Sequence, residues 1–202
     1  MVSDHIQPIS SLGPMANDNT SDEQVIDPVQ KDYLEGRKFF GNGDYTQAAQ
    51  AFHNALRGFE EQGNEQGVAN AADRLGDTCL ARDEYAMALA NYQRSYAICE
   101  KEDDSLSLLA LNKKMAAAYR KLGDREKALE LLYDMLEHYR LTQNPKGAVE
   151  ILIVMAEVYR EQGDKARSAD AYRSVASIHS RFKHARLAEE FNQLAAALEQ
   201  AQ

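Results

Sequence analysis

The sequence predicts an all-α fold, a solenoid of antiparallel helix pairs, and three regularities indicate it. The first is a break between two helical stretches that recurs four times at one constant interval. The four copies are FGNGDYTQAAQAF from Phe40, LARDEYAMALANY from Leu80, RKLGDREKALELL from Arg120 and REQGDKARSADAY from Arg160. In the third copy, Gly123 can adopt the positive φ that ends one helix, and Asp124 can cap the next. Each break therefore marks the turn of a helical hairpin.

The second regularity is a set of small residues at equivalent positions of the repeats. A shift of 40 aligns Gly36, Gly76, Ala116, Ala156 and Ala196 in one column and Ala48, Ala88, Ala128 and Ser168 in another. Bulky residues align beside them, namely Phe39, Cys79, Tyr119 and Tyr159 in one column and Phe52, Tyr92, Leu132 and Tyr172 in another. Small side chains let two helix axes approach closely, and large neighbours fill the space around the contact. The columns therefore predict where helices touch.

The third regularity is the repetition of helix starts. Asn64, Asp104 and Asn144 are favoured N-caps spaced at the same interval, and Pro145 suits the first helical position because its missing N–H costs nothing there. These signals predict first helices at about 28–41, 65–81, 105–121 and 145–161. They predict second helices at about 45–61, 85–100, 125–141 and 165–181, and a ninth helix from about residue 185 to the end.

The predicted pairs form one domain over residues 27–202, because repeating pairs that cannot bury their apolar faces alone must stack. Its repeats cover about 27–63, 64–103, 104–143 and 144–183, followed by a cap at 184–202. Residues 1–26 carry four acidic and no basic side chains and lack helical or strand periodicity. We expect them to form a disordered acidic tail.

The column pattern of Gly/Ala, Phe/Tyr, Gly-Asp, Ala, aromatic and Ala/Ser resembles the tetratricopeptide repeat family over residues 27–202. The resemblance implies a right-handed superhelical solenoid with a concave inner wall. The interval of 40 between copies departs from the commonest repeat length of about 34 residues in this family. Repeats of 40 residues make this sequence similar to those of peptide-sensing bacterial regulators and animal polarity adaptors. Glu35 and Glu199 stand where the family favours an apolar residue, which predicts atypical terminal copies.

Composition and motifs exclude several function classes. The net charge of −9 argues against general nucleic-acid binding, which needs a basic face. No stretch approaches the about 18 to 20 apolar residues of a membrane span. The histidines show no metal-ligand spacing, and GNGD at 41–44 lacks the Lys-Ser/Thr ending of a phosphate loop. We expect no enzyme activity, no metal and no cofactor. Cys79 and Cys99 lie in no CxxC motif, which favours reduced thiols and the cytoplasm.

The residues opposite the core side of each first helix are expected to line the inner wall, because they lie about 180° away at spacings of 3 and 4. The predicted partner-binding residues are Tyr33, Arg37, Phe40, Asn70, Asp73, Asp77, Leu80, Lys113, Arg120, Lys121, Ile153, Glu157 and Arg160. Some family members clamp a C-terminal carboxylate with an asparagine on this wall. Here Arg37, Asp77, Ala117 and Glu157 occupy that position, so this clamp is incomplete.

The wall predicts a non-catalytic adaptor that binds an extended or helical segment of a partner protein. Its apolar side chains offer anchors, and Lys113, Arg120, Lys121 and Arg160 offer a basic centre for acidic groups. The alternative is that these four basic residues form a solvent-exposed face that binds no partner. Two other functions stay open: a regulator that senses a short peptide, and a scaffold that self-assembles as a homo-oligomer through its N-terminal end.

Overall fold

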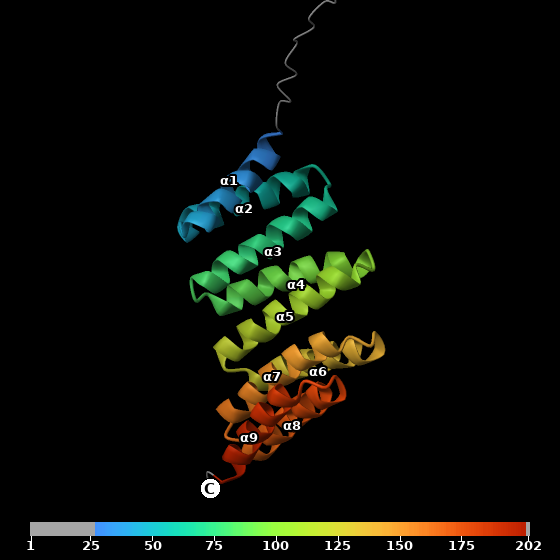
Figure 1. Cartoon of the computed structure of the whole chain (residues 1–202). Coiled ribbons are helices and arrows are strands. Elements are labelled where there is room, and N and C mark those ends of the chain that lie inside the picture. The colour runs from blue at the N-terminus through green and yellow to red at the C-terminus, as the bar shows by residue number, and fades with distance from the viewer. Residues whose placement is uncertain (1–26, 201–202) are drawn as a thin grey trace, which may run out of the picture.

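A computed structural model describes residues 27–200, which contain nine α-helices and no strand (Figure 1). The helices are α1 Pro28–Asn42, α2 Tyr45–Glu61, α3 Glu65–Ala81, α4 Tyr85–Lys101, α5 Ser105–Leu122, α6 Arg125–Leu141, α7 Pro145–Glu161, α8 Lys165–Arg181 and α9 Ala185–Gln200. Each predicted helix is present, and its bounds agree with the sequence prediction to within a residue or two. The predicted tail, residues 1–26, lies outside the described residues.

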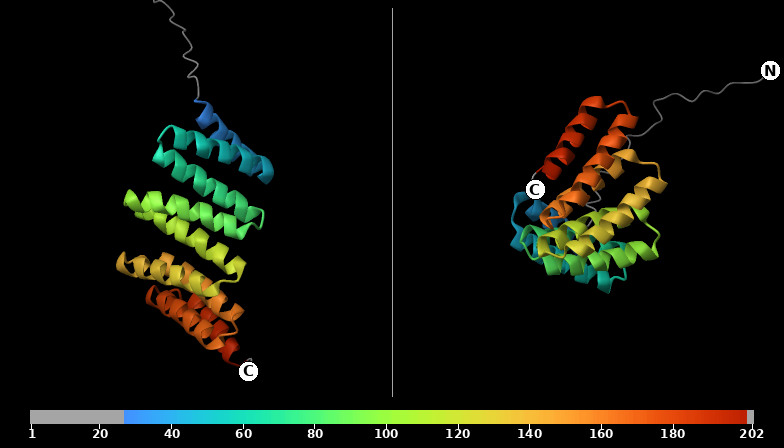
Figure 2. Two further views of the ribbon diagram at one scale, coloured as in Figure 1. Left: turned by 180° about the vertical axis from the view of Figure 1, so that it is seen from behind. Right: turned by 90° about the horizontal axis from the view of Figure 1, so that it is seen from below.

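Each helix packs against the next one along the chain, so the helices form a stack with α1 and α9 at opposite ends (Figure 1). Successive pairs are rotated relative to one another, which is visible along the axis of the stack in Figure 2. The buried apolar residues form four successive clusters along the stack instead of one central core. The protein is therefore a solenoid stabilised by contacts between neighbouring helices.

The small-residue columns are the contact points inside each pair. Ala88 is 0% exposed, and so are its three counterparts in the other repeats. A Cβ atom on Gly76 would lie 2.5 Å from the ring of Tyr92, and one on Gly36 would lie 2.7 Å from the ring of Phe52. Those distances are shorter than any ordinary contact, so the aromatic ring packs directly on the backbone of the facing helix.

The last member of the first column differs from the prediction. Ala196 is exposed, whereas Ala195 beside it is buried. The reason is that α9 occupies the place of a fifth first helix, and no described second helix covers its outer face. On the side toward α8, Glu199 pairs with Arg173. As predicted, the terminal copy is atypical, with a charged residue where the inner repeats bury Cys79 or Tyr159.

The turns follow the predicted capping pattern. Asn64, Asp104 and Asn144 each accept a hydrogen bond from the backbone N–H three residues later. Asp124 does the same for α6, directly after Gly123 at a φ of +90°. The equivalent turn positions that lack glycine still adopt the left-handed conformation, which L-residues reach only at an energetic cost. They are Asp83, Asp103, Gln143 and Lys183.

Replacing Gln143 with glycine is expected to stabilise the protein. Gln143 has a φ of +52°, and glycine removes the steric cost of this conformation. Glycine also loses more backbone entropy on folding, which offsets part of this gain. We therefore expect the free energy of unfolding to rise by about 0.5–1 kcal/mol, measured by urea denaturation. Gln162→Gly is the matched control, because Gln162 has an ordinary φ of −80°. There glycine should destabilise, and equal effects at the two sites would contradict the argument.

Candidate binding groove

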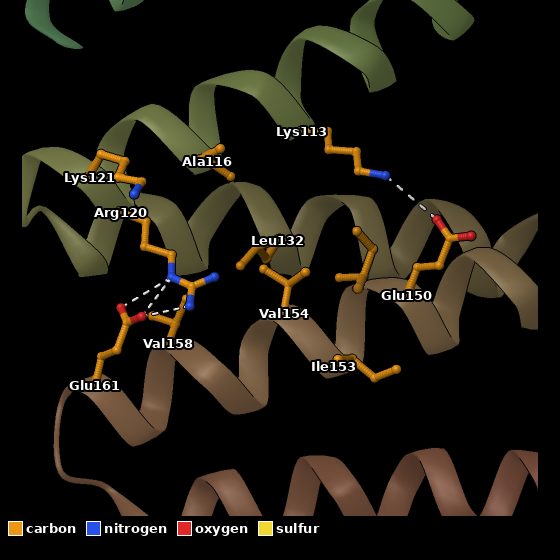
Figure 3. Close-up of a pocket in the computed structure, with 12 residues that line it drawn as sticks. Lys113, Ala116, Arg120, Lys121, Leu132, Glu150, Ile153, Val154, Val158 and Glu161 are labelled. Atoms are coloured by element: carbon orange, nitrogen blue, oxygen red, sulfur yellow. Dashed lines mark hydrogen bonds and ion pairs between the residues drawn. The ribbon is translucent and has the colours of Figure 1, made fainter. Parts of the chain in front are cut away.

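A cavity of about 780 Å³ opens between α5 and α7, on the wall predicted to bind a partner (Figure 3). Its residues come from both first helices and from α6 between them. They are Lys113, Ala116, Ala117, Arg120, Lys121, Leu132, Glu150, Ile151, Ile153, Val154, Val158 and Glu161. Leu132, Ile151 and Val158 are buried core residues, so the floor of the cavity is apolar.

The equivalent space one repeat earlier is closed by charged side chains. The Lys114 ammonium reaches from α5 to two carboxylates of α3, at 2.6 Å from Asp73 and 2.9 Å from Asp77. The Tyr92 hydroxyl donates to Asp77 over 2.9 Å. Burial and the neighbouring Asp77 carboxylate raise the pKa of Tyr92, so the hydroxyl keeps its proton and remains a donor. These side chains bridge α3 and α5 and leave a cavity of only about 70 Å³.

The cavity between α5 and α7 exists because the bridging residues are replaced there. A shift of 40 places Val154 where Lys114 stands and Ala117 where Asp77 stands. Lys113 takes the place of Asp73. A valine is too short to span the gap, and an alanine fills little of it. The open space therefore coincides with the replacement of all three bridging residues in the next repeat.

Ion pairs stand at both ends of this cavity (Figure 3). At one end the Lys113 ammonium lies 3.6 Å from Glu150. At the other end the Arg120 guanidinium lies 2.6 Å from Glu161 and 2.9 Å from Glu157. The hydrogen bond from Arg120 holds the pKa of Glu161 below its usual value. This pair therefore adds stability above the unfolded carboxyl pKa and loses it only as pH falls through the lower folded pKa.

Four of the predicted binding residues line the cavity: Lys113, Arg120, Lys121 and Ile153. Two residues of the predicted basic centre, Lys113 and Arg120, are already paired with glutamates of α7. Glu157 takes part in that pairing, whereas Arg37 and Arg160 are exposed and do not line the cavity.

The remaining predicted residues lie elsewhere or have structural partners. Asn70 and Asp73 line the smaller cavity between α3 and α5, and Asp77 is held there by Lys114. Three apolar residues predicted as anchors pack partly against other residues of the protein. They are Tyr33 against Phe52 and Phe59, Phe40 against Tyr45, and Leu80 against the buried cluster around Tyr92.

The prediction missed the apolar floor of the cavity and one of its ion-pair residues, Glu161. It considered only the outward stripe of each first helix, whereas Leu132 comes from a second helix. The replacement of Lys114 by Val154 in the repeat alignment is the signal that would have located the cavity.

Across residues 27–200, no three His, Cys, Asp or Glu side chains gather as ligands of a metal ion would. None of the helices in the described part of the chain is long and apolar enough to cross a membrane.

Comparisons with known proteins agree with this architecture. A family model described as tetratricopeptide repeat matches residues 31–101 and residues 106–181. No curated protein matches the sequence. The nearly identical TPR-like repeats of a candidate kinesin light chain from Podosopora anserina superpose with a TM-score of 0.66 at 17% identity, over 85% of this chain and 92% of that one.

Two Rap proteins are also similar in structure. RapI in its apo form has a TM-score of 0.73 at 15% identity, over 85% of this chain and 49% of that one. The Rap conjugation gene regulator of plasmid pLS20, in complex with the Phr* peptide, has a TM-score of 0.60 at 13% identity, over 85% of this chain and 53% of that one. The chain thus spans about half the length of each Rap protein, and at such identities the likeness concerns the fold alone. Since the family model matches most of the chain, this protein belongs to the tetratricopeptide repeat family.

Proposed function

We propose that the protein is a non-catalytic adaptor whose concave groove binds a segment of a partner protein. The observation that carries this proposal is the open apolar cavity between α5 and α7. Its volume of about 780 Å³ lies within the usual range of about 300–1,000 Å³ for ligand sites. A few polar groups at its ends surround an apolar floor, which is the arrangement that gives a site both affinity and orientation.

One apolar side chain of the partner is the anchor in this proposal. Burying a side chain of the size of leucine or phenylalanine contributes about 1.5–3 kcal/mol. That is less than the cost of association, so further contacts along the wall must add to it. In this proposal the partner is therefore bound through a segment of several residues and not through the anchor residue alone.

A peptide-sensing regulator is the second candidate, and the position of the cavity favours it. The cavity lies between two repeats, so a ligand that touches both α5 and α7 also affects the spacing of the third and fourth pairs. A sensor should change its small-angle scattering profile when ligand binds, whereas a plain adaptor should not.

The self-assembling scaffold receives less support. The outer face of α1 carries Lys31, Glu35 and Lys38, whereas most of the equivalent residues of the inner first helices are buried and apolar. A charged end face opposes stacking of a second copy on α1.

Filling the cavity should weaken the binding of peptides at least tenfold. A random-peptide phage library is first selected on the wild-type protein, and the affinity of the resulting synthetic peptides is measured by fluorescence anisotropy. Ala117→Phe places a ring where the anchor would lie, so we expect peptide affinity to fall tenfold or more, about 1.4 kcal/mol. The melting temperature should stay within a few degrees, because Ala117 is exposed to the cavity.

The matched control is Ala90→Phe, at an exposed position of α4 away from the cavity. It should leave the affinity unchanged. Equal binding by wild type and Ala117→Phe would place the binding surface elsewhere and contradict the proposal.

A further inference from the structure

The charges around the cavity balance except at one residue. Lys113 is paired with Glu150, and Arg120 is paired with Glu157 and Glu161. Arg125 lies 3.8 Å from Glu161. Lys121 lines the same cavity, is exposed, and has no carboxylate within 4.0 Å among the described residues. Figure 3 shows Lys121 at the end of the cavity where Arg120 lies. Among the charged residues that line the cavity, one positive charge thus remains without a carboxylate partner, at one end only.

A second donor at this end has no acceptor. The Nε atom of Arg125 is buried and makes no hydrogen bond. The nearest carboxylate, that of Glu161, is 3.8 Å away, beyond hydrogen-bond range. Buried donors in folded proteins nearly always have a partner, so the donors around Glu161 outnumber the acceptors that the chain supplies there.

The spacing along α5 sets the geometry of a ligand. Ala117 faces the cavity and Lys121 stands four residues later, one helical turn or about 6 Å along the axis. In an extended peptide, residues two apart are separated by about 6.6 Å and project to the same side. An anchor over Ala117 and a carboxylate at Lys121 therefore belong to residues i and i+2 of one extended segment, in either chain direction.

We propose that the groove recognises an extended segment of a partner protein in which a large apolar residue and a carboxylate stand two residues apart. The apolar side chain enters the cavity between α5 and α7, and the carboxylate binds the Lys121 ammonium. This inference rests on the proposed adaptor function and adds the chemical class of the ligand. It also assigns Lys121 as a residue that determines specificity.

The test uses synthetic heptapeptides with one leucine and one glutamate on a glycine–serine background, at separations of one, two and three residues. Binding is followed by NMR of the 13C-labelled methyl groups of Leu132, Ile151, Val154 and Val158, which line the cavity. The peptide with separation two should shift these methyl signals at the lowest concentration. Exchanging its glutamate for glutamine should weaken binding about twofold to fivefold, the upper part of the range for one exposed ion pair.

The protein variant Lys121→Glu should bind the glutamate peptide with a similarly reduced affinity. The glutamine peptide should bind this variant and the wild type with equal affinity. Lys38→Glu is the matched control, because Lys38 is also exposed and lies on α1, far along the stack from the cavity. It should bind like the wild type.

The outcomes separate this inference from the function on which it rests. Loss with Lys121→Glu, together with a preference for separation two, supports both. If the library-selected peptides bind and shift the cavity methyl signals, but neither their acidic residues nor Lys121 affects the affinity, the ligand class is wrong and the adaptor function stands. If neither the library nor the heptapeptides yield any binding, the adaptor function fails and the inference fails with it.

Discussion

Replacing Ala88 with glutamate is expected to remove most of the stability of the second and third helix pairs. Ala88 is 0% exposed and belongs to the cluster that contains Cys79, Tyr92 and Met115. The new side chain overfills a close helix contact and buries a carboxylate without a partner. We expect the free energy of unfolding to fall by about 3 kcal/mol or more, measured by urea and thermal denaturation.

The control for this prediction is Ala86→Glu, two residues earlier on the same helix. Ala86 is exposed, so its replacement should change stability by less than about 0.5 kcal/mol. A small effect at both positions would mean that the repeat register, and with it every contact assigned by the columns, is wrong. Because the solenoid is stabilised by neighbour contacts, the terminal pairs should keep part of their helical signal in the variant.

The repeat made the fold predictable to a large extent. Four copies of one pattern define the register of every helix, because an error at one copy would break the alignment at the other three. The N-caps at Asn64, Asp104 and Asn144 then located the starts of three helices. Ala196 shows where this logic ends. A column predicts that a residue can make a contact, but burial also requires a helix on the other side.

The sequence predicted which residues face the inner wall, but not that an open cavity lies there. The angular position of a residue on its helix predicts which side it faces, and this placed Lys113, Arg120 and Ile153 at the cavity. Whether the space between two first helices is open depends on side chains that cross it. Whether a side chain crosses this space depends on the length and charge of residues in two successive repeats, as in the ion pair of Lys114 with Asp73. The stripe of residues on one helix does not show which residue faces it on the next first helix.

Contacts between successive repeats also explain why part of the predicted basic centre is paired with acidic residues. Arg120 faces the wall as expected, but Glu157 and Glu161 lie one turn apart on α7 and together receive its guanidinium. The acids were visible in the sequence, and only their distance from Arg120 was not. Lys121 retained its free charge because it is exposed at the rim, beside the pair and not within it.

Replacing Lys114 with valine should be strongly destabilising on its own. The Asp73 and Asp77 side chains are 21% and 16% exposed. The variant leaves the Asp73 carboxylate partly buried without its cation, whereas Asp77 keeps its ion pair with Arg74 at 3.1 Å. Removing one partner of such a pair costs more than the pair contributes, since the remaining charge stays desolvated. We expect a loss of about 2–4 kcal/mol in the free energy of unfolding, measured by urea denaturation. Lys113→Val, which removes an exposed ammonium one residue earlier, is the control and should cost below about 1 kcal/mol.

The double variant Lys114→Val with Asp77→Ala tests why only one interface is open, because it gives the α3–α5 interface two of the residues found between α5 and α7. Asp77→Ala alone removes the acceptor of the Tyr92 hydroxyl and one partner of Lys114. In the double variant no Asp77 carboxylate remains to lose its contact with the Lys114 ammonium, so the two single losses should sum to about 1–2 kcal/mol more than the loss measured for the double variant. A crystal structure should then show a cavity between α3 and α5 beside the introduced valine, comparable to the one beside Val154. Additive losses, or an interface that stays closed, would mean that the ionic bridge is not what fills this space and that the open cavity has another cause.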